Sequence, residues 1–313
     1  MQQVKYIFNR ILQMFPVLIV ISFIVFGSMR LIPGDPAVKM LGDKATEETL
    51  AALRAKMGLD KPFLVQYLYY LKQTAKLDFG NSIYLKQSVL SLFLEKSVVT
   101  VSLTVLTAFF SVLISFPLGF YAGIHGDGRF GRLVSSLSLI FTSVPIFWLG
   151  LLMLMLLALR FPVFPVGGWG TSFMEHLHSL ILPSFVGSLS TMTLIIRNIQ
   201  ASVVNVLKKD YVDFAYSKGL SARKVTSGYI MRNVLVSTVT LLSIRITGLL
   251  GGSVVIESVF ALPGIGSLLL TGVLSRDYTL VQGLVFLFGV IVLVINLLTD
   301  ISYSFLDPRV TLK

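Results

Sequence analysis

The sequence predicts an all-α membrane protein with six transmembrane helices and one external soluble segment between the first two. Hydrophobic residues make up 55% of the 313 residues and charged residues only 13%, whereas about 25% of the residues of a soluble domain are charged. Six stretches with at most one charge reach the length of about 20 apolar residues that crosses a bilayer. Because backbone in lipid must satisfy its own hydrogen bonds, we expect each stretch to be helical.

The expected spans are Ile11–Met29, Ser97–Ile124, Leu133–Leu159, His178–Ile196, Asn233–Ile256 and Tyr278–Thr299. Basic residues precede the first span, as they do in a cleaved signal sequence. Its 19 uncharged residues exceed the 7–15 of a usual signal core, and they run directly into Arg30. We therefore expect the first span to be retained.

The distribution of Lys and Arg sets the expected orientation. With a cytoplasmic N-terminus, the inside segments hold thirteen basic and five acidic residues. The outside segments hold twelve basic and ten acidic residues, mostly in one long loop where the positive-inside rule has little force. We expect both termini in the cytoplasm. The net charge of +11 then reflects topology and attraction to the lipid bilayer, and no nucleic-acid partner is expected, since a soluble basic face is absent.

The external segment divides the chain into three expected parts: a transmembrane helix at 1–30, the segment at 31–96, and a five-helix core at 97–313. Within the segment, we expect Thr46 to cap a short helix and Gly58 to end it. Pro62 then begins the next part of the segment. A segment of this size supports only a marginal core of its own, so we expect it to pack on the outer ends of the helices.

A polar stretch at 197–232 separates two of the spans. Residues at helical spacing are expected to place a bulky aromatic ridge on one side of a short helix: Tyr211, Phe214, Ala215 and Lys218. Gly219 is expected to end this helix in the left-handed conformation, and Ser221 to cap the next one. Such a ridge suits insertion into a groove of a partner protein. The alternative is an ordinary amphipathic helix that rests on lipid headgroups.

Arg245 is the one ionisable residue near the middle of an expected span. Because a charge at that depth is costly, it is expected to face a pathway and attract a substrate carboxylate, or else to bond backbone carbonyls or snorkel. Gly248, Gly251 and Gly252 follow and would allow close helix approach.

The sequence after that span, ESVFALPGIGSLL, is expected to be external. Pro263, Gly264 and Gly266 would break a helix there and favour a short folded-back segment that gates the mouth of the pathway. A simple loop between two spans is the alternative. In the span Ser97–Ile124, Gly119 and Gly123 have the spacing of a helix contact. Kinks are predicted at three prolines of three different spans, Pro117, Pro145 and Pro183.

The residues provide no chemistry of their own. The absence of cysteine excludes disulfides, thiolate metal sites and a cysteine nucleophile. His176 and His178 fit a solvated loop better than a metal site, since only Glu175 is nearby. No phosphate-binding G-x-x-x-x-G-K-[ST] loop and no catalytic constellation occur. We expect neither cofactor, metal nor enzymatic activity, and any ATP-derived energy must come from another subunit.

The polar stretch resembles the cytoplasmic loop motif of ABC importer permeases, E-A-A, three residues, G, nine residues, I-x-L-P. Asp213, Phe214, Ala215 and Gly219 fall on its first three positions and its glycine. Asp and Phe replace Glu and the first Ala, and the I, L and P places hold Tyr229, Met231 and Arg232.

These departures fit the peptide and nickel branch of the family, which the KGLS at Lys218 followed by MRN at Met231 resembles. Four further strings are similar to that branch in the same order: PGDP at Pro33, LDFGNS at Leu77, GGSVVIESVFALPGIG at Gly251 and LDPR at Leu306. The resemblance therefore covers almost the whole chain.

The resemblance implies a MetI-like, type I importer permease in a bacterial or archaeal cytoplasmic (inner) membrane. Its implied partners are a second homologous permease, two cytoplasmic ATP-binding subunits and an extracellular or periplasmic substrate-binding protein. The implied coupling residues are Tyr211, Asp213, Phe214, Ala215, Lys218 and Gly219, with Phe214 as the inserted bulk. The implied substrate is a dipeptide or oligopeptide, with nickel or a metal chelate as the alternative. A secondary transporter or channel is a distant alternative, because no inverted repeat or set of protonatable span residues is visible.

Overall fold

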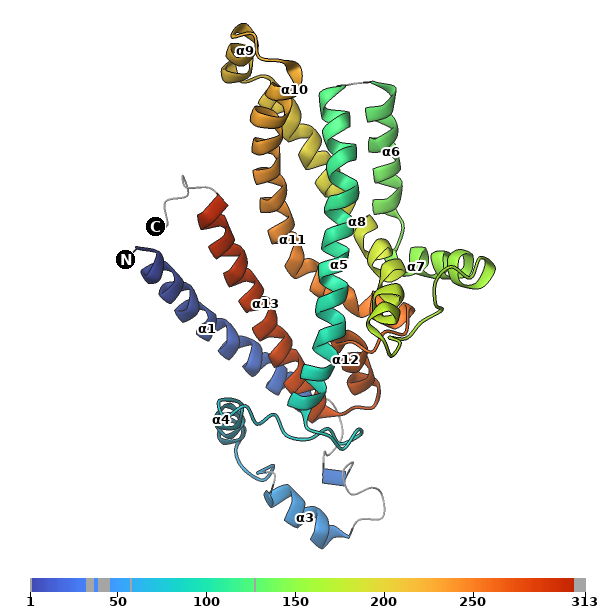
Figure 1. Ribbon diagram of the computed structural model, residues 1–313. Helices are drawn as coiled ribbons and strands as arrows, with labels where there is room; N and C mark the ends of the chain where they lie inside the picture. The colour runs from blue at the N-terminus through green and yellow to red at the C-terminus, as the bar shows by residue number, and fades with distance from the viewer. Residues whose placement is uncertain (1, 32–36, 39–45, 57, 127, 307–313) are drawn as a thin grey trace. The chain divides into compact units, whose positions relative to one another are not determined.

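The computed structural model describes residues 2–31, 37–38, 46–56, 58–126 and 128–306, and every regular element in these ranges is helical (Figure 1). Within these ranges, five helices are long and apolar enough to cross a membrane. They are α1 (Gln2–Leu31), α5 (Val89–Ile124), α8 (Phe173–Leu207), α11 (Met231–Val259) and α13 (Tyr278–Leu306). Each contains one of the expected spans, so the predicted fold class and five of its spans are confirmed. Pro33–Pro36 and Asp307–Arg309, from two of the motif strings, lie outside the described residues.

The expected span Leu133–Leu159 is not one continuous helix. Helix α6 (Arg129–Ser143) stops before Pro145. The next helix, α7 (Ile146–Leu154) with the π-helical turn η1 (Met155–Arg160) that continues it, is bent by 99° relative to α6. Proline has no amide hydrogen to donate and forces the residue before it out of the helical region, and Val144 is accordingly extended. The predicted break at Pro145 is thus confirmed, and the pair is a sixth span only if it crosses together.

The chain forms two compact units. One comprises Met1–Val98 with Ser267–Leu297, and in it α4 (Phe63–Thr74) packs on α1 through aromatic rings. Phe63 and Tyr67 each contact Phe23 and Phe26 at ring-centroid separations of 5.3–5.9 Å. The Tyr67 hydroxyl also lies 2.8 Å from Ser22 Oγ. The expected packing of the external segment on a helix is therefore confirmed for α4.

The stretch that contains Ser82 and Tyr84 is attached to the turn before α13. Asp277 is almost fully buried, and its carboxylate accepts hydrogen bonds from the Ser82 hydroxyl at 2.6 Å and the Tyr84 amide at 3.0 Å. Helix α3 (Glu47–Lys56) shows the expected ends: the Thr46 hydroxyl accepts from the Thr49 amide, and Gly58 has a φ of +66°.

The other unit comprises Val99–Gly266 with Leu298–Lys313, and α8 is its most buried long helix. A capping box starts α8, because the Ser172 and Glu175 side chains each accept a hydrogen bond from the other's backbone amide. A Cβ on Gly119 would stand 2.8 Å from the Ile196 carbonyl oxygen, and one on Gly123 would stand 2.6 Å from Val203 Cβ. The predicted helix contact at these two glycines is therefore confirmed.

Candidate functional site

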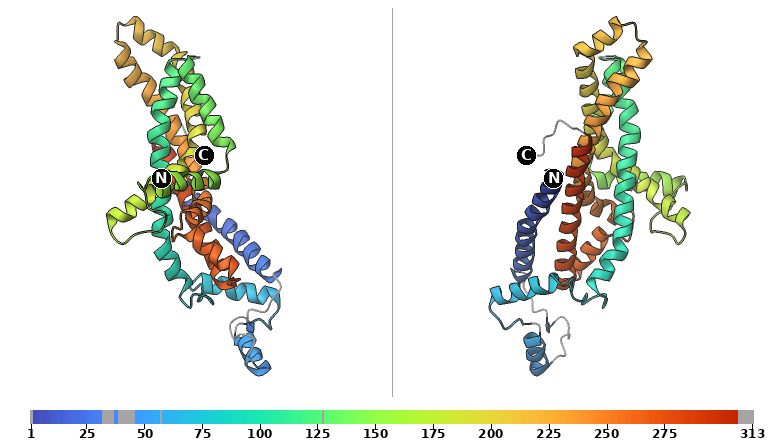
Figure 2. Two further views of the ribbon diagram at one scale, coloured as in Figure 1. Left: turned by 90° about the vertical axis from the view of Figure 1, so that its right-hand side faces the viewer. Right: turned by 60° about the vertical axis from the view of Figure 1, so that its left-hand side comes forward.

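The polar stretch after α8 folds into two short helices, α9 (Asp210–Ser217) and α10 (Ala222–Val225). These cap one end of α8 and α11 in all views (Figure 2). Gly219 has a φ of +77°, its amide donates to the Tyr216 carbonyl at 2.9 Å, and the Leu220 amide donates to the Ala215 carbonyl at 3.3 Å. These two bonds form the helix-ending motif that requires a left-handed residue. Ser221 stands at the expected N-cap but its side chain makes no capping bond.

Helix α9 presents its aromatic side chains outward. Phe214 is 60% exposed and Tyr211 is also exposed. The Lys218 ammonium lies 4.6 Å from the centroid of the Phe214 ring, in cation–π geometry. Asp213 is exposed beside them. The outer face therefore combines one bulky ring with adjacent charges of both signs.

Ala215 does not belong to that outer face, in contrast to the expected ridge. It is 3% exposed and shares the inner face with the buried Val212. Both pack in one cluster with Ile199 of α8 and Val234 of α11. The small side chain of Ala215 thus allows α9 to lie close against the two long helices. The inner face of α9 packs on α8 and α11, and its outer face points away from them.

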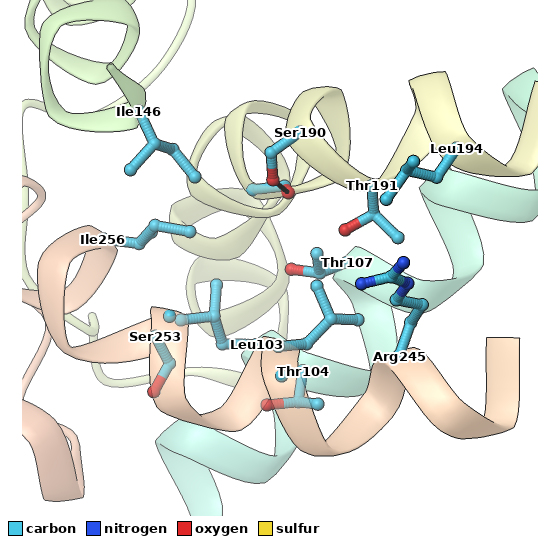
Figure 3. A pocket seen from close by; sticks show the side chains of 14 residues that line it. Leu103, Thr104, Thr107, Ile146, Ser190, Thr191, Leu194, Arg245, Ser253 and Ile256 are labelled. Carbon is cyan, nitrogen blue, oxygen red and sulfur yellow. Dashed lines mark hydrogen bonds between the residues drawn. The ribbon is translucent and has the colours of Figure 1, made fainter. Parts of the chain in front are cut away.

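A cavity of about 230 Å³ lies among α5, α7, α8 and α11 of the same unit. Figure 3 shows the Arg245 guanidinium pointing into it, toward Thr107 and Thr191. Thr104, Ser190 and Ser253 are the further hydroxyl-bearing residues of a lining that is otherwise apolar. Hydroxyls and one cation in an apolar wall can orient a polar ligand that carries an anionic group.

Arg245 has no hydrogen bond or ion pair with another residue in the described part of the chain, so no backbone carbonyl holds its side chain there. The expected close helix approach is not seen among the described residues at Gly248, Gly251 and Gly252, because a Cβ on any of them would meet nothing within 4 Å. Gly248 and Gly252 line the cavity instead of a helix contact.

The sequence after Ile256 is largely buried within the protein. Helix α11 extends to Val259, and Glu257 is 0% exposed. The Thr100 hydroxyl donates to the Glu257 carboxylate at 2.8 Å and accepts from the Ile265 amide at 2.8 Å. One hydroxyl therefore ties the end of α11 to the first residue of α12 (Ile265–Leu274).

The glycines of the PGIG string make room for this carboxylate. A Cβ on Gly264 would collide with the Glu257 carboxyl group, and one on Gly266 would stand 2.6 Å from Val254 Cα. Pro263 lies between the end of α11 and α12. The segment is thus a clamped turn that leads into a short apolar helix, and neither of the two expected forms describes it fully.

Replacing Thr100 by Val should loosen this turn. The variant keeps the side-chain volume but leaves the Ile265 amide without its acceptor and Glu257 without one donor, and a buried unsatisfied group costs about 1–3 kcal/mol. Thr238→Val is the matched control, since the buried Thr238 hydroxyl bonds only the Val234 carbonyl of its own helix. Hydrogen exchange at Ile265 should accelerate in Thr100→Val alone. Equal exchange in both variants would contradict the clamp.

The histidine pair is used structurally. His176 stacks on Trp169 with ring centroids 4.3 Å apart, and a ring nitrogen of His178 lies 2.8 Å from the Val163 carbonyl oxygen. No group of three or more His, Cys, Asp or Glu that could hold a metal ion occurs among the described residues.

Comparison with known proteins identifies the family. Residues 115–312 match the model described as binding-protein-dependent transport system inner membrane component, and residues 3–104 match its N-terminal counterpart. A permease protein of Brucella abortus (strain 2308) is 37% identical over 308 residues, covering 97% of this chain and 98% of the relative.

Two further relatives carry more specific names. The oligopeptide transport system permease protein AppB of Bacillus subtilis (strain 168) is 32% identical, with 97% of this chain and 98% of the relative covered. The dipeptide transport system permease protein DppB of Escherichia coli (strain K12) is 30% identical, with 99% of both chains covered.

The fold is that of a solved importer. The inward-facing MetNI methionine ABC transporter contains a chain that superposes with a TM-score of 0.58 at 17% identity, covering 70% of this chain and 97% of that one. The resemblance inferred from the motifs is thereby confirmed. The chain belongs to the family of binding-protein-dependent transport system inner membrane components, the multi-pass membrane permeases of ABC importers.

Proposed function

We propose that this chain is a permease subunit of an ATP-driven peptide importer and forms half of its translocation pathway. Motion of the ATPase subunits is transmitted to the chain through α9. One observation carries the proposal: α8 and α11 flank α9 in the chain, share its inner core, and also line the Arg245 cavity. A displacement of α9 is therefore passed by packed side chains to the walls of the cavity.

The partners follow from this arrangement and from the family. One of two cytoplasmic ATP-binding subunits would receive the outer face of α9, with Phe214 inserted into a cleft and Asp213 and Lys218 at its rim. A second homologous permease would complete the pathway, and an extracellular or periplasmic binding protein would deliver the substrate. Both termini would then lie in the cytoplasm, as the basic residues predict.

Arg245 and the turn at Pro263, Gly264 and Gly266 have separate roles in this proposal. The guanidinium attracts the C-terminal carboxylate of the peptide, since it points into the cavity without a counter-charge from the described residues. The clamped turn, held by Glu257, forms part of the external gate. The chain itself performs no catalysis, because the ATPase subunits hydrolyse ATP.

A peptide substrate is favoured by the names of AppB and DppB, and nickel or a metal chelate remains the alternative. Uptake of a labelled tripeptide and of nickel should be compared in cells that keep the companion subunits, with and without this chain. The proposal predicts that only peptide uptake depends on the chain. Dependence of nickel uptake alone would overturn the peptide assignment and leave the permease assignment standing.

A further inference from the structure

Helix α8 is mostly buried but keeps one exposed stripe. Between Ser179 and Leu207 its exposed residues are Ser190, Leu194, Arg197, Ala201 and Asn205. They recur every three or four positions and therefore lie on one face. The stripe is a continuous surface along the central helix of its unit.

The composition of this stripe differs from that of a lipid-facing surface. Between Val101 and Leu113 the exposed residues of α5 are Val101, Val105, Phe109 and Leu113, all of them apolar. Side chains that face acyl chains are expected to be apolar, because polar and charged groups are costly there. The α8 stripe instead contains a hydroxyl, a guanidinium and an amide, which suit a water-filled route or a partner protein.

Arg197 lines a second cavity, of about 420 Å³, between α6 and α8. Ser135 comes from α6, and Gln200 and Asn205 join Arg197 from α8. No hydrogen bond or ion pair joins Arg197 to another residue within the described ranges. The cavity therefore offers a cation and two amides to a ligand.

The two cavities follow one another along the stripe. Leu194 lines the cavity that contains Arg245, and Arg197 lines the second one. Three residues correspond to a rise of about 4.5 Å along a helix. A ligand group that moves from Arg245 along α8, toward the end at which α9 follows, would therefore reach Arg197 next.

We propose that Arg197, together with the amides of Gln200 and Asn205, is a second carboxylate-binding position on the peptide route. The C-terminal carboxylate of the peptide occupies it after leaving Arg245. A guanidinium binds a carboxylate through two parallel hydrogen bonds, and amide NH₂ groups supply further donors. Successive sites of moderate strength let a ligand both enter and leave. The inference rests on the proposed function as a peptide importer.

The first test measures peptide uptake by the complete importer in vesicles. Arg197→Gln should lower the uptake rate about tenfold, the scale of one lost charge-assisted hydrogen bond, with unchanged assembly of the complex. Arg197→Lys should retain an intermediate rate because it keeps the charge. Arg129→Gln is the matched control, since Arg129 is an exposed arginine of α6 outside the cavity, and it should transport like the unaltered chain.

The second test uses the absence of cysteine from the sequence. Arg197→Cys places a single thiol in this chain, and a methanethiosulfonate reagent attaches to it as a mixed disulfide with release of methanesulfinate. A positively charged aminoethyl reagent should restore uptake, and a negatively charged sulfonatoethyl reagent should not. In Ala201→Cys, which lines the same cavity and keeps Arg197, transported peptide should slow labelling by an uncharged methanethiosulfonate, whereas exchanging neutral for anionic phospholipid should leave the labelling rate unchanged.

The outcomes separate the two proposals. If the unaltered importer fails to take up peptide, the proposed function fails. If it takes up peptide while Arg197→Gln matches Arg129→Gln, only the role of Arg197 is overturned. Labelling that anionic lipid slows and peptide does not would assign the cavity to a lipid headgroup, which also overturns the inference.

Discussion

Gly219→Val should abolish most peptide uptake while the complex still assembles and hydrolyses ATP. Gly219 has a φ of +77°, in a region that costs a residue with a Cβ about 1–2 kcal/mol, with a further cost for a β-branched side chain. A Cβ at this position would meet no atom within 4 Å, so the expected effect comes from the backbone conformation alone. Relaxing the turn would shift the outer face of α9 against its core.

The measurement is the ratio of peptide taken up to ATP hydrolysed by the reconstituted complex. It should fall about tenfold, the factor that corresponds to about 1.4 kcal/mol, a value within the range of the backbone cost. Gly219→Asn is the matched control, because Asn enters the left-handed region more readily than other non-glycine residues. It should retain most of the coupling. A Val variant with the same ratio as the Asn variant would remove Gly219 from the coupling mechanism.

Arg245→Ala is expected to have the second large effect, on uptake and not on stability. The guanidinium points into the cavity and bonds no other residue in the part of the chain that the structure describes, so its loss should leave thermal unfolding of the complex nearly unchanged. Loss of one charged contact to a carboxylate corresponds to about 1.5–3 kcal/mol, or a fall in uptake of about tenfold or more.

Arg245→Lys provides the comparison, since it keeps the charge but loses the two-pronged geometry and should give an intermediate rate. Uptake and the melting temperature of the purified complex are measured for each variant. A parallel loss of both quantities in Arg245→Ala would show that Arg245 is structural, and unchanged uptake would remove it from the pathway.

The local elements could be predicted from sequence because their causes are local. The lengths of the stretches without charged residues predicted five spans. The ease with which glycine adopts the left-handed conformation predicted the turn at Gly219 and the helix end at Gly58. Likewise, the lack of an amide hydrogen in Pro145 and its effect on Val144 located the break before α7, although the angle of 99° depends on packing.

The parts that depend on distant residues could not be predicted. The burial of Glu257, which follows an apolar span, could not be predicted, because the hydroxyl that bonds its carboxylate lies 157 residues away, on Thr100. Ala215 has the spacing of the aromatic ridge, but Val212 and the neighbouring helices determine which side of α9 faces the core. The role proposed for Arg197 depends on the packing of α6 against α8, which leaves one stripe of α8 exposed. This packing between two helices cannot be read from a single sequence.

The central claim is that α9 transmits ATP-driven motion to a peptide pathway in this chain. The most direct test reconstitutes the chain with its companion permease, ATPase subunits and binding protein, and measures labelled peptide uptake and ATP hydrolysis in the same vesicles. The account predicts that loaded binding protein raises both rates together and that Phe214→Ala, which removes the exposed ring of α9, breaks the link between them. Peptide uptake that proceeds without the ATPase subunits, or that stays tied to hydrolysis in the Phe214 variant, would contradict it.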